Sequence, residues 1–232
     1  MWCPGYDVLL NRGHTHGKDG SYKWLSRQKR DVFVKQAKFN NWRCRSAFKL
    51  IEIDDKHNIF KFGDVVVDCG ASPGSWSQVT VDRVNATGKN DGPVGLVIGI
   101  DLLPIAPLPG AVFLDSTDFT DPSVLARIEK VKETRPFQVI NTVISDMSPN
   151  ATGIKSLDHE LSTELCLSAL KFALTVLPRG GHFISKLLQG QEQKRLEILL
   201  AKFFRTVSVF KPKASRLDSC EIYLVAKKRI MK

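Results

Sequence analysis

The chain has 232 residues, and its 34 lysines and arginines against 24 acidic residues give a formal net charge of +10. This length fits one domain with a short extension, and the apolar content of 43% is enough for a hydrophobic core. No apolar run approaches the roughly 20 residues of a transmembrane helix, so we predict no membrane span. The charge favours a polyanionic partner, nucleic acid first and an anionic membrane second, although a soluble protein can also simply be basic.

The cysteines argue against a metal site. None of them forms a Cys-x-x-Cys pair, so the sequence predicts no zinc site and no other bound metal. Their odd number and the apolar neighbours of Cys69 and Cys166 favour reduced thiols in a reducing compartment. The five cysteines are Cys3, Cys44, Cys69, Cys166 and Cys220.

Three regions differ in pattern. Residues 1–20 are rich in glycine and show little periodicity, so we expect a flexible leader; targeting cannot be read from it. Residues 21–58 predict basic helices, the second from about Ser46 to Asp55, with aromatic residues between the cations. That mixture suits RNA phosphate contacts and base stacking, but it also suits an ordinary solvated helix face. Residues 59–232 form the main domain.

The main domain alternates between strand and helix patterns, which predicts an α/β fold with an open, mostly parallel sheet and helices on both faces. The loop between the last two expected strands is too short for a crossover helix, so these strands are predicted to pair antiparallel. Strands are expected at 65–69, 94–100, 111–114, 139–145, 182–185, 206–210 and 221–226. Helices are expected at 75–84, 122–132, 159–177 and 191–204.

A glycine-rich turn follows the first of these strands. Its spacing is Asp-x-Gly-x-x-x-Gly, starting at Asp68, and not the Gly-x-Gly-x-x-Gly of dinucleotide sites. The turn therefore favours a nucleoside ligand without phosphates, of which S-adenosylmethionine (SAM) is the common one. The alternative is a turn that binds nothing. The cofactor-binding candidates in this stretch are Gly70, Pro73, Gly74, Ser75 and Trp76.

Five polar residues are predicted to lie along the same edge of the sheet, each at or near the end of a strand. In an open parallel sheet, ligands bind beyond the carboxyl ends of the strands. Asp101 is placed to accept hydrogen bonds from ribose hydroxyls, and Asp118 to accept one from an adenine amino group. For any single acid, a helix cap or a turn is the favoured explanation, but for five polar residues on one edge it is not. The five are Asp101, Asp118, Asp146, Lys186 and Glu221.

Lys186 is the candidate base. It is predicted to end an apolar strand, and a buried lysine charge is costly unless it is paired. Burial and a second cation, such as Lys49, favour a neutral amine that can accept a proton, whereas Asp146 and Glu221 favour the protonated form. The sequence leaves open which influence is larger.

Several motifs together resemble the FtsJ/RrmJ family of ribose 2′-O-methyltransferases, over about Trp24 to Ala226. The resemblance implies a Rossmann-like SAM-dependent methyltransferase fold, with strand order 3-2-1-4-5-7-6 and strand 7 antiparallel. The motifs are Arg45-Ser46-Ala47-Phe48-Lys49-Leu50, the stretch from Asp68 to Gln78, Asp101-Leu102-Leu103-Pro104, Ser145-Asp146-Met147-Ser148-Pro149-Asn150 and Ser219-Cys220-Glu221-Ile222-Tyr223.

The resemblance also implies roles for individual residues. The family's catalytic tetrad matches Lys49, Asp146, Lys186 and Glu221. Its SAM contacts match Gly74, Trp76, Asp101, Asp118 and Asp146. The chain departs from the family at Ser72 and Ser75, and neither difference removes a side chain that the mechanism needs.

Within the family, the chain is most similar to the mitochondrial large-subunit rRNA branch. That implies a uridine in the A-loop as the target, large-subunit rRNA or a pre-ribosomal particle as the partner, and the mitochondrial matrix as the location, with the cytoplasm as the alternative. Three other functions stay open: an rRNA-binding assembly factor with a structural SAM site, a small-molecule or protein methyltransferase, and, least favoured by the glycine spacing, a nicotinamide oxidoreductase.

Overall fold

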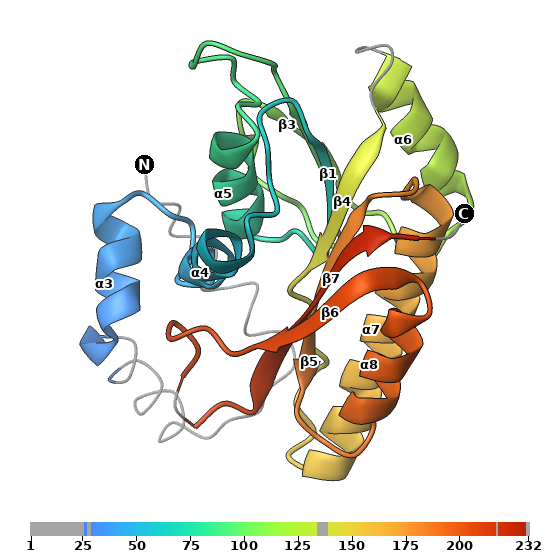
Figure 1. The fold of residues 1–232 in the computed structure, drawn as a ribbon. Coiled ribbons are helices and arrows are strands. Elements are labelled where there is room, and N and C mark those ends of the chain that lie inside the picture. Colours follow the sequence, from blue (N-terminus) through green and yellow to red (C-terminus); the bar gives the residue numbers. More distant parts are fainter. Residues whose placement is uncertain (1–25, 27–28, 134–138, 217, 231–232) are drawn as a thin grey trace.

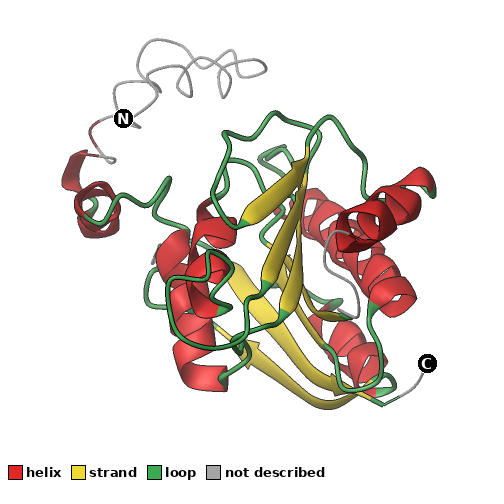
Figure 2. Cartoon of the chain, turned by 90° about the horizontal axis from the view of Figure 1, so that it is seen from above, coloured by secondary structure: helices red, strands yellow, loops and turns green. Residues whose placement is uncertain are grey.

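A computed structural model describes residues 26, 29–133, 139–216 and 218–230, so the expected leader at 1–20 lies outside the described residues. One seven-stranded sheet lies between two layers of helices (Figures 1 and 2). The elements are α3 (Val32–Phe39), α4 (Ala47–His57), β1 (Val65–Cys69), α5 (Ser75–Arg83), β2 (Leu96–Ile100), β3 (Ala111–Leu114), α6 (Ser123–Glu133), β4 (Ile140–Ser145), α7 (Lys155–Val176), β5 (His182–Leu188), α8 (Gln193–Ala201), β6 (Phe204–Phe210) and β7 (Glu221–Arg229).

The strand order confirms the predicted topology. It runs β3-β2-β1-β4-β5-β7-β6, with β7 antiparallel to both of its neighbours. β1 lies in the interior of the sheet and pairs in parallel with β2 and β4. Because the parallel strands all point the same way, their carboxyl ends meet at one edge, and β7 begins at that same edge.

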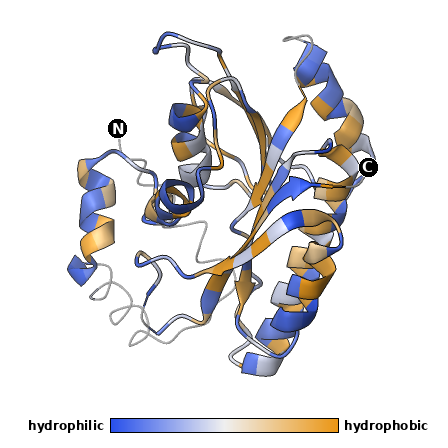
Figure 3. Cartoon of the chain, in the orientation of Figure 1, coloured by the Kyte–Doolittle hydropathy of each residue, from blue (hydrophilic) through white to orange (hydrophobic). Residues whose placement is uncertain are grey.

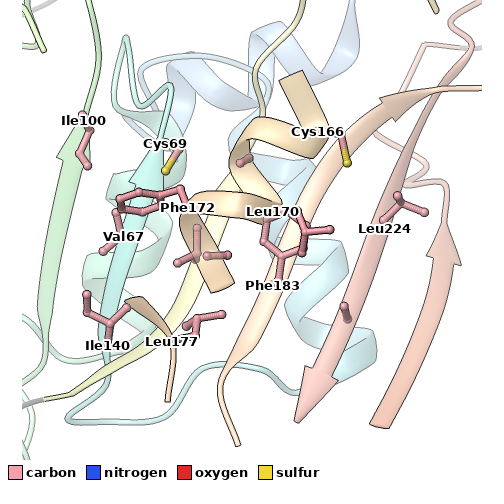
Figure 4. Close-up of a cluster of buried hydrophobic side chains, with 14 of the residues drawn as sticks. Val67, Cys69, Ile100, Ile140, Cys166, Leu170, Phe172, Leu177, Phe183 and Leu224 are labelled. Carbon is pink, nitrogen blue, oxygen red and sulfur yellow. The ribbon is translucent and has the colours of Figure 1, made fainter. Parts of the chain in front are cut away.

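Each face of the sheet has its own core. Helices α6, α7 and α8 cover one face, where Val67, Cys69, Phe172 and Phe183 belong to a continuous apolar cluster (Figure 4). Helices α4 and α5 cover the other face. Cys69 and Cys166 lie in the first core as free thiols. Within the described residues, no helix is long and apolar enough to cross a membrane.

Several element boundaries differ from the prediction by one to four residues, among them those of β5 and α7. β5 does not end before Lys186 but continues to Leu188, because its ladder with β7 extends to the pair Leu188 and Glu221. Lys186 is therefore an internal residue of β5, directly opposite Tyr223. Helix α7 begins at Lys155, four residues before the predicted start.

One carboxyl group is buried in β1. Asp68 is only 1% exposed; its Oδ2 accepts a hydrogen bond of 2.7 Å from the Ser77 hydroxyl, and its Oδ1 has no partner among the described residues. Burial, followed by the charges of Asp146 and Asp101, raises the pKa of Asp68 to about 7. A carboxyl whose pKa rises on folding holds its proton more tightly in the folded state, so its contribution to stability falls as the pH rises towards 7.

We expect Asp68→Asn to remove this pH dependence. We compare the free energy of unfolding of the wild type with that of Asp68→Asn. From pH 5 to pH 8 the wild type loses about 3 kcal/mol relative to the variant, because at the higher pH the wild type must ionise a buried carboxyl. Urea unfolding of both proteins at the two pH values measures this, with the exposed Asp91→Asn as a control for loss of a carboxylate. An equal difference at both pH values contradicts the assignment.

Candidate active site

The structure brings the four residues of the predicted tetrad together as two ion pairs. Lys49 from α4 pairs with Glu221 at the start of β7, with Nζ to Oε1 at 2.8 Å. Lys186 from β5 pairs with Asp146, just after β4, with Nζ to Oδ1 at 3.1 Å. All four side chains are at least 83% buried, so each charge is withdrawn from water but has an opposite charge beside it, as a buried ion requires.

Asp146 has more partners than any other member of the tetrad. Its carboxylate accepts hydrogen bonds from the Ser46 hydroxyl and from the Tyr223 hydroxyl, the latter at 2.7 Å, besides its contact with Lys186. Burial alone raises the pKa of Asp146, but Lys186, Lys49 and the two hydroxyl donors outweigh burial and hold the pKa at about 2. Asp146 is therefore ionised at neutral pH and acts only as an acceptor.

The Lys186 amine is held from one side. Both recorded contacts of its Nζ go to Asp146, one to the carboxylate and one of 2.5 Å to the backbone carbonyl. In the ion pair the ammonium has three N–H donors and no lone pair; after loss of one proton, two donors remain for the two Asp146 oxygens and the lone pair is left for a third group. This arrangement is compatible with a base that takes a proton from a substrate hydroxyl.

Ser46 and Tyr223 were not assigned roles from the sequence. Ser46 lies three residues before Lys49, a spacing that puts two residues on one face of a helix. Tyr223 lies two residues after Glu221, a spacing that puts two residues on one face of a strand. These spacings were the available signal. The Trp76 indole donates to the carbonyl and hydroxyl oxygens of Ser46 at 3.0 and 3.1 Å, and its ring packs 5.6 Å from that of Tyr223, so Trp76 supports both.

The glycine-rich turn lies at the same edge of the sheet. Gly70 (φ +75°) and Gly74 (φ +101°) have left-handed backbone conformations, and a Cβ on either would collide, with Met147 and with Arg43 respectively. Gly74 is the N-cap of α5 and offers no side chain, which leaves first-turn N–H groups of this helix for a ligand. Asp101, next to the turn, accepts from the Ser72 N–H at 2.8 Å.

The other predicted cofactor residues have varied surroundings. Ser75 is buried, and its hydroxyl accepts a contact of 2.9 Å from the Cys44 thiol. Pro73 offers its carbonyl to Arg43. Asp118 lies on an exposed turn and accepts from the N–H and hydroxyl of Thr120, so its recorded partners belong to that turn and not to the tetrad. No cluster of three metal-binding side chains occurs in the described ranges.

Arg43 is a further residue that the sequence did not single out. Its guanidinium donates to the carbonyls of Pro73 and Pro107, each at 2.8 Å, and its backbone N–H donates to Gln78. Arg43 thus joins the basic N-terminal segment to the glycine-rich turn and to the loop between β2 and β3. That loop and β3 also enclose a pocket of about 500 Å³, lined by Ile105, Pro107, Leu108, Pro109, Ala111, Phe113 and Asp115.

Comparison with known proteins identifies the family. The model of the FtsJ-like methyltransferases matches residues 42–229, a stretch that contains the whole tetrad and the glycine-rich turn. Over 208 residues the chain is 45% identical to "rRNA methyltransferase 2, mitochondrial" of Drosophila melanogaster, covering 89% of this chain and 82% of that protein. Over 210 residues it is 42% identical to "Ribosomal RNA large subunit methyltransferase E" of Mesorhizobium japonicum, covering 90% and 76%.

A solved structure agrees with these matches. A ribosomal RNA methyltransferase from Plasmodium falciparum superimposes with a TM-score of 0.69 at 31% identity, covering 82% of this chain and 100% of that one. The resemblance drawn from the sequence motifs is therefore confirmed at the level of the family. The chain belongs to the FtsJ-like methyltransferases.

Proposed function

We propose that the chain transfers a methyl group from SAM to the 2′-oxygen of a uridine ribose in large-subunit rRNA, within the A-loop. The observation that carries this proposal is the Lys186–Asp146 pair, which holds an amine at the sheet edge beside the glycine-rich turn. The name of the Drosophila relative supports rRNA as the substrate, and the name of the Mesorhizobium relative supports large-subunit rRNA. The choice of uridine rests on the family resemblance.

The residues at this edge fit SAM. The Asp101 carboxylate follows β2 at the position suited to ribose hydroxyls, and the open N–H groups at the start of α5 suit a carboxylate. When bound, SAM supplies a methyl group on a positively charged sulfur, which a nucleophilic oxygen can accept.

The protein's own groups prepare that oxygen. In this proposal, Lys186 removes the proton of the ribose 2′-hydroxyl, and the proton stays on Nζ, where the Asp146 carboxylate stabilises the new charge. Ser46 and Tyr223 hold that carboxylate in place. Lys49 and Glu221 neutralise each other 2.8 Å apart and orient the hydroxyl.

The basic residues near the amino terminus are proposed to hold the RNA backbone, together with Lys211, Lys213 and Arg216. The structure links these two groups. Arg45 and Arg216 both lie near the Asp31 carboxylate, at 3.3 and 3.7 Å, and the Arg45 guanidinium donates to the carbonyl of Ala214 at 2.5 Å. The loop between β6 and β7 and the segment before α4 thus form one continuous surface.

We further propose that the protein acts in the mitochondrial matrix, supported by the mitochondrial relative, with the cytoplasm as the alternative. Fractionation of cells that express the full chain with a C-terminal tag tests this. A matrix location predicts protection of the tag from protease in intact mitochondria.

Lys186→Ala is expected to abolish transfer, because a general base contributes about a hundredfold to ten-thousandfold in rate. Lys186→Arg is expected to be equally inactive, since arginine keeps the positive charge beside Asp146 but does not give up its proton. The measurement is transfer of a labelled methyl group from SAM to large-subunit rRNA, with the product mapped by ribose-methylation sequencing. SAM binding, measured by calorimetry, is expected to remain.

The exposed Lys194→Ala is the matched control and is expected to transfer normally. Normal turnover by Lys186→Arg contradicts the proposal that Lys186 is a base. In that case the role of Lys186 is purely electrostatic. If the wild type binds SAM but methylates no rRNA, free or in particles, the assembly-factor function replaces the enzymatic one.

Arg43→Lys is expected to raise the KM for SAM about threefold to tenfold with little change in kcat, because one amine cannot serve both carbonyls and a hydrogen bond is worth about 1 kcal/mol. Steady-state kinetics at saturating RNA measure both constants. Arg45→Lys is the control, since Arg45 has no recorded contact with the turn. An equal rise in KM in both variants, or a fall in kcat alone, contradicts the role of Arg43.

A further inference from the structure

A group of basic residues lies at the end of the sheet opposite the candidate active site. Lys61 precedes β1, His182 is the first residue of β5, and Lys227 and Lys228 lie near the end of β7. We call these four residues the amino-edge basic patch. Lys228 is seven residues along β7 from Glu221, a distance of about 23 Å in an extended strand. In Figure 3 the end of β7 is drawn in the blue of hydrophilic residues.

The positive charge of the patch belongs to its three lysines, because the His182 ring is neutral at physiological pH. Burial, followed by Lys227, Lys61 and Lys228, lowers the pKa of His182 to about 4. The neighbouring His57 behaves similarly, because burial, Lys227 and Lys56 lower its pKa. The charges that act on the His182 and His57 rings all come from lysines. The Asp64 carboxylate lies beside Lys61 and accepts from its backbone N–H at 2.9 Å.

The backbone at Lys228 adds a second, independent observation. This lysine has a φ of +60°, the left-handed region that glycine, asparagine and aspartate adopt more readily. It also lies across from Arg205, because Phe204 pairs with Arg229 and Thr206 with Lys227 on either side. Like charges across a strand pair are unfavourable. A strained lysine beside further cations is a poor choice for stability alone, which points to a role in binding.

We propose that the amino-edge basic patch binds phosphate groups of the RNA substrate, far from the nucleotide that is methylated. This inference rests on the proposed function and names a second contact surface for the same partner. Lys61 and Lys228 are exposed and able to reach phosphates, while Phe62, which is 45% exposed beside Lys61, offers a ring on which a base can stack.

The position of the patch selects the kind of RNA. The catalytic edge and the patch lie at opposite ends of the strands, so RNA reaches both only if it folds around the protein. A large folded rRNA meets this requirement, whereas a stem-loop docked at the catalytic edge does not. The patch therefore contributes affinity for large RNA and little for a short hairpin.

The test uses the full chain and two variants. Lys228→Gly removes one charge and also suits the left-handed backbone, so this variant is expected to fold at least as well as the wild type. Lys61→Gln combined with Lys228→Gly removes two charges. The control is Lys171→Gln combined with Lys194→Gln, which removes two exposed lysines from α7 and α8. Thermal unfolding of all four proteins checks their folding.

Dissociation constants are measured for large-subunit rRNA and for a 20-nucleotide stem-loop across a range of salt concentrations. For large-subunit rRNA, the double patch variant is expected to lose about tenfold in affinity at physiological salt, and its plot of log K against log[salt] becomes shallower by about one to two units. Its affinity for the stem-loop is expected to match the wild type, as is the control's affinity for both RNAs.

Equal affinity of the wild type and the double patch variant for large-subunit rRNA overturns the proposal, as does an equal loss in the control. So does patch-dependent binding to phosphatidylserine vesicles with unchanged RNA binding, which assigns the patch to a membrane surface. The binding assay needs no methyl transfer. If rRNA binding depends on the patch but no rRNA is methylated, the proposed function is refuted and the patch proposal stands. If rRNA is methylated but its binding does not depend on the patch, the patch proposal is refuted and the proposed function stands.

Discussion

The ionised carboxylate of Asp146 is the constraint on which the candidate site depends. A buried carboxylate is stable only where donors and cations surround it, and here they come from positions far apart in the chain: Ser46 before α4, Lys186 in β5 and Tyr223 in β7. The same contacts that hold its pKa at about 2 fix the relative positions of these elements. Loss of one donor therefore alters the charge balance and the geometry of the site together.

The sheet makes this arrangement possible. The five parallel strands β1 to β5 deliver their carboxyl ends to one edge, and the antiparallel β7, between β5 and β6, begins at that edge with Glu221. Tyr223 is consequently opposite Lys186 in the ladder, and both face the layer of α4 and α5, which supplies Lys49 and Ser46. The glycine-rich turn, in contrast, depends on backbone shape, because Gly70 and Gly74 occupy conformations that other residues rarely adopt.

The sequence predicted the fold well because the local pattern and the family resemblance agreed. β1 was placed at Val65–Cys69 without error, and the strand order was confirmed. The end of β5 was wrong, because pairing with β7, and not local composition, decides where that strand stops. The supporting roles of Ser46, Tyr223 and Arg43 could not be predicted, since each depends on a contact across 30 to 100 residues of chain. The roles in cofactor and RNA binding stay predictions.

The position of β7 has a consequence for how the protein matures. Among the described residues it follows the other six strands in sequence, yet it lies between β5 and β6 in the sheet, and it supplies both Glu221 and Tyr223. A growing chain that stops before β7 has neither the partner of Lys49 nor the hydroxyl that holds Asp146, and β5 and β6 have no strand to join them. The Lys49–Glu221 pair and the contact from Tyr223 to Asp146 can therefore form only after β7 has left the ribosome, so a chain that stops before β7 has an incomplete candidate site.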